Sequence, residues 1–161
     1  MKSVLISIQP KWCELIASGK KTVEVRKTKP KIDTPFKCYI YETKGIYKPS
    51  GSNHFFNGEG KVIGEFVCDR IENCLDINMD ATCLTVPEWL KYTQGHKGNV
   101  WGWHISDLVI YDKPKELHHF FKPCGDCDKK GTKRCTEELT DCRAKVITRP
   151  PQSWCYVEEG R

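Results

Sequence analysis

The sequence predicts a barrel or α+β domain that is dominated by short strands, with few short helices between them. Short apolar or alternating segments recur along the whole chain, whereas helical periodicity is confined to a few brief stretches. Because strands do not alternate with long helices, a parallel βαβ sheet is not expected. The 161 residues show no repeat and no linker, so we expect one domain spanning 1–161. The expected strands are residues 3–9, 21–27, 36–41, 61–71, 99–111 and 153–158.

Composition narrows the functional classes. Lysine and arginine number 26 and aspartate and glutamate 21, which gives a formal net charge of +5. This mild basic excess is compatible with phosphate binding but does not require it. No apolar run approaches the roughly 18 residues of a membrane span, and the N-terminus lacks a signal-peptide core. We therefore expect a cytoplasmic protein that does not bind a membrane. Its ten cysteines should be reduced thiols or metal ligands.

The expected helices follow from local signals. Pro10 suits the first position of a helix over 10–18, which Gly19 would end in a left-handed cap. Thr85 and Glu88 match a capping box, which predicts a helix that stops near Gly95. A third short helix is predicted over 114–120. Residues 43–60 form a long irregular stretch, and a loop of this length is functional or partly mobile.

The most informative segment is Gly-Lys-Lys-Thr-Val-Glu-Val-Arg at residues 19–26. Because a strand has a period of two, Thr22, Glu24 and Arg26 are expected on one face, with Lys21 at the junction before it. A carboxylate beside a guanidinium and an ammonium can hold a phosphate, a base edge or an amide. The alternative is a solvated strand face with a weak surface ion pair.

This segment, placed after an apolar strand and a short helix, resembles the signature of the ASCH domain family. Residues 103–111 with the following Lys113-Pro114 resemble a later strand of that family, and residues 149–154 resemble the closing strand of its longer bacterial and phage members. The resemblance implies an α+β fold of the PUA-like type, a mixed β-barrel with short flanking helices. It also implies a cleft beside the first helix, with RNA or a nucleotide or nucleoside ligand as partner.

Some small family members are amidohydrolases that act on N4-acylated cytidine-type nucleosides, and others are described as nucleases. The hydrolases use a lysine, a threonine and a distant glutamate. Lys21 matches the lysine, but Glu24 stands where the threonine is expected. For hydrolysis, Lys21 would act as base, Glu24 would transfer a proton and Arg26 would stabilise negative charge. The departure at Glu24 favours RNA or nucleotide binding, with amidohydrolase or ribonuclease activity as the alternative.

Further ligand-binding residues are predicted near both later motifs. Trp103 and Trp154 can stack on an unpaired base, and His104 can read a base edge. The alternative for these aromatic residues is core packing, which is the expected role of Trp12, Trp89 and Trp101. The complete set predicted to bind RNA or ligand is Lys21, Thr22, Glu24, Arg26, Trp103, His104, Ser106, Arg149, Gln152 and Trp154.

A cysteine-rich insert over 122–145 predicts a structural zinc site. Two cysteines separated by two residues present two sulfurs to one ion, and four thiolates complete a tetrahedral site. The insert is rich in Gly, Asp and Lys, so a metal would supply folding energy that it lacks. Free thiols, an iron–sulfur site or a redox pair are alternatives, and Cys155 or His118 could replace one ligand. The predicted zinc ligands are Cys124, Cys127, Cys135 and Cys142.

Overall fold

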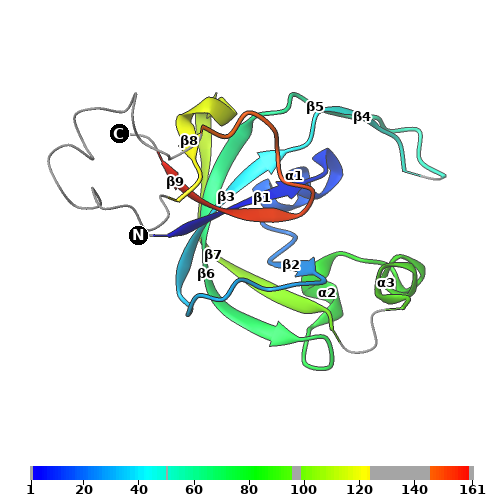
Figure 1. Ribbon diagram of the computed structural model, residues 1–161. Helices are drawn as coiled ribbons and strands as arrows, with labels where there is room; N and C mark the ends of the chain where they lie inside the picture. The colour runs from blue at the N-terminus through cyan, green and yellow to red at the C-terminus, as the bar shows by residue number, and fades with distance from the viewer. Residues whose placement is uncertain (1, 50, 96–98, 124–145, 160–161) are drawn as a thin grey trace, which may run out of the picture.

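A computed structural model describes residues 2–49, 51–95, 99–123 and 146–159. These residues form a curved seven-stranded sheet in the order β2-β7-β6-β3-β1-β9-β8, and a separate two-stranded ribbon, β4-β5 (Figure 1). The strands are β1 Ser3–Ile8, β2 Val23–Arg26, β3 Phe36–Glu42, β4 Gly45–Tyr47, β5 Phe56–Gly58, β6 Val62–Asn73, β7 Trp101–Lys115, β8 Phe120–Phe121 and β9 Trp154–Glu159. The helices are α1 Pro10–Ala17, α2 Met79–Thr82 and α3 Val86–Thr93.

The sheet is mixed, which confirms the predicted fold class. β1 pairs with β3 in parallel, and the remaining strand pairs of the sheet are antiparallel. The long strands β6 and β7 shift register several times, and such bulges increase the local bend of a sheet. β2 lies at one end of the strand order and β1 near the other, yet the Arg26 side chain donates to the Ser7 carbonyl at 2.7 Å. The sheet therefore curls far enough to bring its end strand β2 within side-chain reach of β1.

β1 is buried on both faces, as its unbroken apolar sequence predicts. Val4 and Ile6 belong to the cluster that packs under α1, together with Cys13 and Ile16. Leu5 points to a second cluster, which contains Tyr39 and Phe120. Each fully buried aliphatic side chain contributes about 1.5–3 kcal/mol through removal of apolar surface from water. β1 is thus held by apolar packing on both of its faces.

The predicted helix over 114–120 is wrong. β7 continues to Lys115, and only a single 3₁₀ turn at Leu117–His119 follows. The physical reason is Pro114, because the residue before a proline is pushed into extended conformations and prolongs the strand.

Two further elements lie where no regular structure was expected. The long stretch over 43–60 contains the ribbon β4-β5, and α2 begins after Asn78, whose side chain accepts from the Asp80 N–H at 3.0 Å. None of the helices in the described part of the chain combines the length and apolar character needed to cross a bilayer.

Candidate functional site

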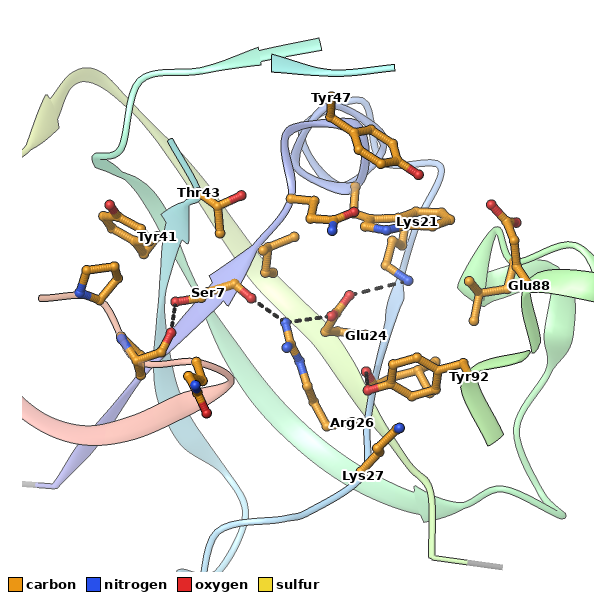
Figure 2. Close-up of a pocket in the computed structure, with 18 of the residues that line it drawn as sticks. Ser7, Lys21, Glu24, Arg26, Lys27, Tyr41, Thr43, Tyr47, Glu88 and Tyr92 are labelled. Carbon is orange, nitrogen blue, oxygen red and sulfur yellow. Dashed lines mark hydrogen bonds and ion pairs between the residues drawn. The ribbon is translucent and has the colours of Figure 1, made fainter. Parts of the chain in front are cut away.

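A pocket of about 960 Å³ opens where α1, the end of β1, β2 and α3 meet (Figure 2). The residues just before β9 and the start of the ribbon complete its wall. Aromatic, basic and acidic side chains are prominent in its lining. The aromatic residues are Trp12, Tyr41, Tyr47 and Tyr92, the basic residues are Lys21, Arg26, Lys27, Lys44 and Lys91, and the acidic residues are Glu24 and Glu88.

Lys21 lies on the floor of the pocket, and only 3% of its surface is exposed. Gly19 adopts a left-handed conformation (φ +74°) at the end of α1, which turns the chain toward β2. The Lys21 ammonium donates to the carbonyls of Val23 at 2.9 Å and Thr82 at 2.7 Å, and it lies 3.3 Å from Glu24 Oε2. Three acceptors match the three N–H groups of a lysine ammonium. All three N–H groups of Lys21 are therefore engaged by the protein. This arrangement suits a residue that holds neighbouring groups, such as the Glu24 carboxylate, in position.

Glu24 joins Lys21 to Arg26. Its other oxygen, Oε1, lies 2.9 Å from Arg26 Nη2, and the same nitrogen donates to the Ser7 carbonyl (Figure 2). Glu24 is buried and Arg26 nearly so. Arg26 Nε is buried and has no hydrogen-bond partner among the described residues. We call Lys21, Glu24 and Arg26 the buried array. It contains two cations and one anion, so its formal charge is 2 − 1 = +1.

Aromatic rings border the buried array. The Lys21 ammonium lies 5.1 Å from the centre of the Trp12 ring, and Lys11 lies 4.2 Å from it. Tyr92 donates its hydroxyl to the Val25 carbonyl at 3.1 Å, which attaches α3 to β2. Burial raises the pKa of the Tyr92 phenol, so the group stays neutral near pH 7. The pocket thus places flat apolar surfaces beside a buried positive charge.

The mouth of the pocket carries exposed cations and one ion pair. Lys27, Lys44 and Lys91 are exposed, and Lys27 lies 5.1 Å from the centre of the Tyr92 ring. Lys11 on α1 donates to Glu88 on α3 at 2.9 Å, and this ion pair joins the two helices. Burial alone would raise the pKa of Glu88, but hydrogen bonds from Lys11 and from the Thr85 cap outweigh it and hold the pKa below its ordinary value.

The predicted residues of β7 lie away from this pocket. Trp103 is 0% exposed and packs against Phe36 in the core, so its ring has no open face. His104 bonds to Glu72 at 2.7 Å, and Ser106 donates to the Val67 carbonyl. None of the three predicted β7 residues lines the pocket. Thr22 is exposed and precedes β2, which begins at Val23, so it does not join Glu24 and Arg26 in the pocket either.

The closing segment reaches the pocket in part. Gln152 lines it beside Pro150 and Pro151, whereas Arg149 is exposed and lies outside it. Trp154 packs 5.8 Å from Trp103, measured between ring centres, and its indole N–H donates to Thr28. Trp154 is thus engaged in packing.

The predicted zinc ligands Cys124, Cys127, Cys135 and Cys142 lie outside the described residues. Across 2–49, 51–95, 99–123 and 146–159, no group of three or more His, Cys, Asp or Glu side chains could hold a metal ion. Cys155 is half-buried in β9, and burial raises the pKa of its thiol. The zinc site remains a prediction.

Several pocket residues were not anticipated from the sequence. Trp12 was assigned to the core, and Tyr47 lay in a segment predicted only as a loop. Tyr92 and Lys91 lie on α3. Its capping box predicts the helix from the sequence, but it does not predict where the helix packs on the rest of the protein. The useful signal was the length of the stretch over 43–60, because loops of that length are often functional.

The curved mixed sheet, with a polar pocket beside its first helix, defines a PUA-like barrel-type domain. The ASCH domain family matches residues 6–144, which is most of the chain, so the protein belongs to that family.

Solved structures agree with this fold. An ASCH protein from Zymomonas mobilis is 19% identical, with a TM-score of 0.60 over 97% of this chain and 87% of that one. A point variant of the Zymomonas mobilis protein gives 19% identity and a TM-score of 0.61 over 98% and 91% of the two chains. At this identity the likeness concerns the fold alone. No curated protein matches the chain at a significant level.

Proposed function

We propose that this protein binds RNA, or a nucleotide-derived ligand, in the pocket beside α1. The observation that carries the proposal is the buried array, which holds a formal charge of +1 at the floor of an open pocket. Where buried positive charge exceeds the neighbouring negative charge, the site attracts an anionic ligand or a strong hydrogen-bond acceptor. ASCH membership brings the same general expectation of an RNA-binding type of domain.

Each part of the pocket suits a different part of a nucleotide. Arg26 lines the pocket, and its guanidinium carries five N–H donors, of which the contacts to Glu24 and Ser7 engage those of Nη2. Lys27, Lys44 and Lys91 at the mouth can neutralise phosphates, which supply most of the sequence-independent affinity for RNA. Trp12, Tyr47 and Tyr92 offer aromatic rings of the kind on which unpaired bases stack.

The geometry favours binding over hydrolysis. A lysine base must present its amine to the substrate, whereas the three N–H groups of Lys21 are matched by the Val23 and Thr82 carbonyls and by Glu24. Both Glu24 oxygens are likewise held by cations. Amidohydrolase or ribonuclease activity is the alternative. It is tested by chromatography after incubation with N4-acetylcytidine or with a short RNA. A product that the unsubstituted protein forms and the Glu24→Gln variant does not would favour enzymatic activity.

The binding proposal is tested by fluorescence anisotropy with a labelled single-stranded RNA at several salt concentrations. Arg26→Met should weaken binding about 10-fold to 100-fold, because a hydrogen bond to a charged group is worth about 1.5–3 kcal/mol. Lys91→Met should weaken binding to all sequences alike and lower the salt slope by about 0.7, the value for one lost phosphate contact on a single strand. Lys113→Met, on β7 outside the pocket, is the matched control.

Thermal unfolding separates lost binding from lost structure. Lys91 is exposed, so its variant should melt like the unsubstituted protein. RNA affinity that is unchanged in both Arg26→Met and Lys91→Met, at matched salt, would contradict the proposal.

A further inference from the structure

Apart from Tyr47, the two-stranded ribbon β4-β5 has no role in the function proposed so far. We use this name for β4, β5 and the described residues between them, 48, 49 and 51–55. It leaves the sheet next to α1 and projects from the barrel (Figure 1). Its first residues, however, belong to the pocket, because Tyr47 and the preceding Lys44 both line the pocket wall.

The base of the ribbon is fixed to the barrel by close backbone contact. A Cβ atom at Gly58 would lie 1.9 Å from the Thr43 carbonyl oxygen and 2.6 Å from Pro10 Cγ, so only glycine fits there. Gly58 pairs with Gly45, and the Glu59 N–H donates to the Glu42 carboxylate at 3.1 Å. The ribbon therefore leaves the pocket in a set direction.

The ribbon has two different faces. Tyr47 pairs across the ribbon with Phe56, and the His54 ring lies 4.4 Å from the Phe56 ring. Two apolar side chains of the ribbon are open to solvent, since Ile46 is 74% exposed and Phe55 58% exposed. The ribbon thus carries two exposed apolar side chains, Ile46 and Phe55, while its Tyr47 lines the pocket, and exposed apolar surface on an element that borders a binding site suggests a contact surface.

The charge around this surface indicates its partner. The ammonium of Lys48 lies 4.9 Å from the centre of the Phe55 ring, and Lys44 is exposed at the ribbon's base. Between residues 43 and 59 the only acidic residue in the sequence is Glu59. Two acids from neighbouring elements also reach the ribbon, since Glu14 on α1 lies 3.9 Å from His54 and the Glu42 carboxylate accepts from the Glu59 N–H. The feature that is typical of single-strand nucleic acid recognition is the aromatic ring beside a lysine.

We propose that single-stranded RNA which places one nucleotide in the pocket continues along the ribbon. A neighbouring base stacks on Phe55, and the phosphates contact Lys48 and Lys44. This inference rests on the function proposed above and extends it, because it makes the ligand an RNA strand and not a free nucleotide. Stacking of one base and the added phosphate contacts together predict an affinity for a strand well above that for a mononucleotide.

The test compares uridine monophosphate with a uridine hexanucleotide, by calorimetry at one salt concentration. Phe55→Ser should lower affinity for the hexanucleotide about 5-fold to 100-fold and leave that for the mononucleotide unchanged. Phe55→Tyr, which keeps a stacking ring, should restore it. Lys48→Gln should lower the affinity for the hexanucleotide and leave that for the mononucleotide unchanged. Leu75→Ser and Lys113→Gln are matched exposed controls that should bind both ligands normally.

The outcomes separate the two proposals. Hexanucleotide affinity that is unchanged in Phe55→Ser and Lys48→Gln would overturn the role of the ribbon, whether or not the pocket binds. RNA affinity that falls in Phe55→Ser and Lys48→Gln but not in Arg26→Met would overturn the pocket as a binding site. It would leave the role of the ribbon standing. Sedimentation that shows a dimer lost in Phe55→Ser, with RNA affinity unchanged, would identify the surface as a contact between copies and would also overturn the inference.

Discussion

The Lys21 ammonium contacts two carbonyl oxygens and one carboxylate, and this set of contacts explains why a lysine can be buried here. Removing one partner of a buried ion pair leaves the other charge without compensation, which typically costs about 3–5 kcal/mol. In this protein the same change would also leave the Val23 and Thr82 carbonyls without their donor. We infer that Lys21 positions Glu24, and that Glu24 in turn orients Arg26.

A double-mutant cycle tests this order. Lys21→Met should lower the free energy of unfolding by about 3–5 kcal/mol. Combined with Glu24→Gln, it should cost less than the sum of the two single changes, with a coupling of about 0.5–3 kcal/mol. Urea unfolding measures each value.

The Lys61–Glu116 pair supplies the control, because it is partly exposed and its atoms lie 3.4 Å apart. Lys61→Met should cost less than about 1 kcal/mol. Strict additivity of the Lys21 and Glu24 changes would show that the two side chains act independently, against our interpretation.

At the residue scale the sequence was informative about neighbours and silent about distant partners. The period of a strand placed Glu24 and Arg26 together, and the structure brings both into the pocket. Thr82 lies 61 residues from Lys21 along the chain, and no local pattern predicts that contact. Trp103 was a plausible base-stacking residue by type, but burial is decided by the packing of several strands.

At the element scale, α3 is attached to the pocket mainly through polar contacts. No residue of α3 is buried, and its contacts include the ion pair between Lys11 and Glu88 and the hydrogen bond from Tyr92 to Val25. Its capping box was evident in the sequence, and the structure confirms both halves of it at Thr85 and Glu88. The attachment to α1 was not evident, because it joins residues 77 positions apart.

The ion pair predicts a pH-dependent contribution to stability. The folded pKa of Glu88 is lowered from 4.5, so its contribution is complete above pH 4.5 and is lost as the pH falls through the folded pKa. The difference in stability between the unsubstituted protein and Glu88→Gln should therefore be largest near neutral pH. It should shrink as the pH is lowered below 4.5 and through the folded pKa of Glu88.

Urea unfolding over this pH range measures the difference. Another acid, Glu65, also has a lowered pKa, because hydrogen bonds from Lys37 and Tyr111 outweigh the effect of burial, but it is present in both proteins and its effect cancels. Glu14→Gln, at an exposed site on α1, is the control. A difference that stays constant from neutral to acid pH would refute the role of the ion pair.

At the scale of the whole molecule, the predicted mixed barrel with short helices is confirmed. Alternation of apolar residues was sufficient to find the long strands, because each covers a continuous core. The curl of the sheet could not be predicted in the same way. It depends on register shifts between β6 and β7, which are set by packing between strands and not by the pattern along either one.

The cysteine-rich insert over 122–145 contributes a prediction of a different kind. We expect close to one zinc ion per chain, bound by Cys124, Cys127, Cys135 and Cys142, in protein purified without chelator. Serine at Cys127 should remove the metal and lower the melting temperature, because metal binding supplies folding energy to such a segment. Serine at Cys74, outside the insert, is the control. A folded protein with almost no metal would contradict the zinc assignment.

The central claim is that the buried array forms the floor of a ligand site. The most direct measurement is a crystal structure of the protein with uridine monophosphate or a short single-stranded RNA bound. Our account predicts a nucleotide in the pocket beside α1, with a polar atom within hydrogen-bond distance of Arg26. A nucleotide bound elsewhere on the protein, with the pocket over Lys21, Glu24 and Arg26 left open, would contradict it.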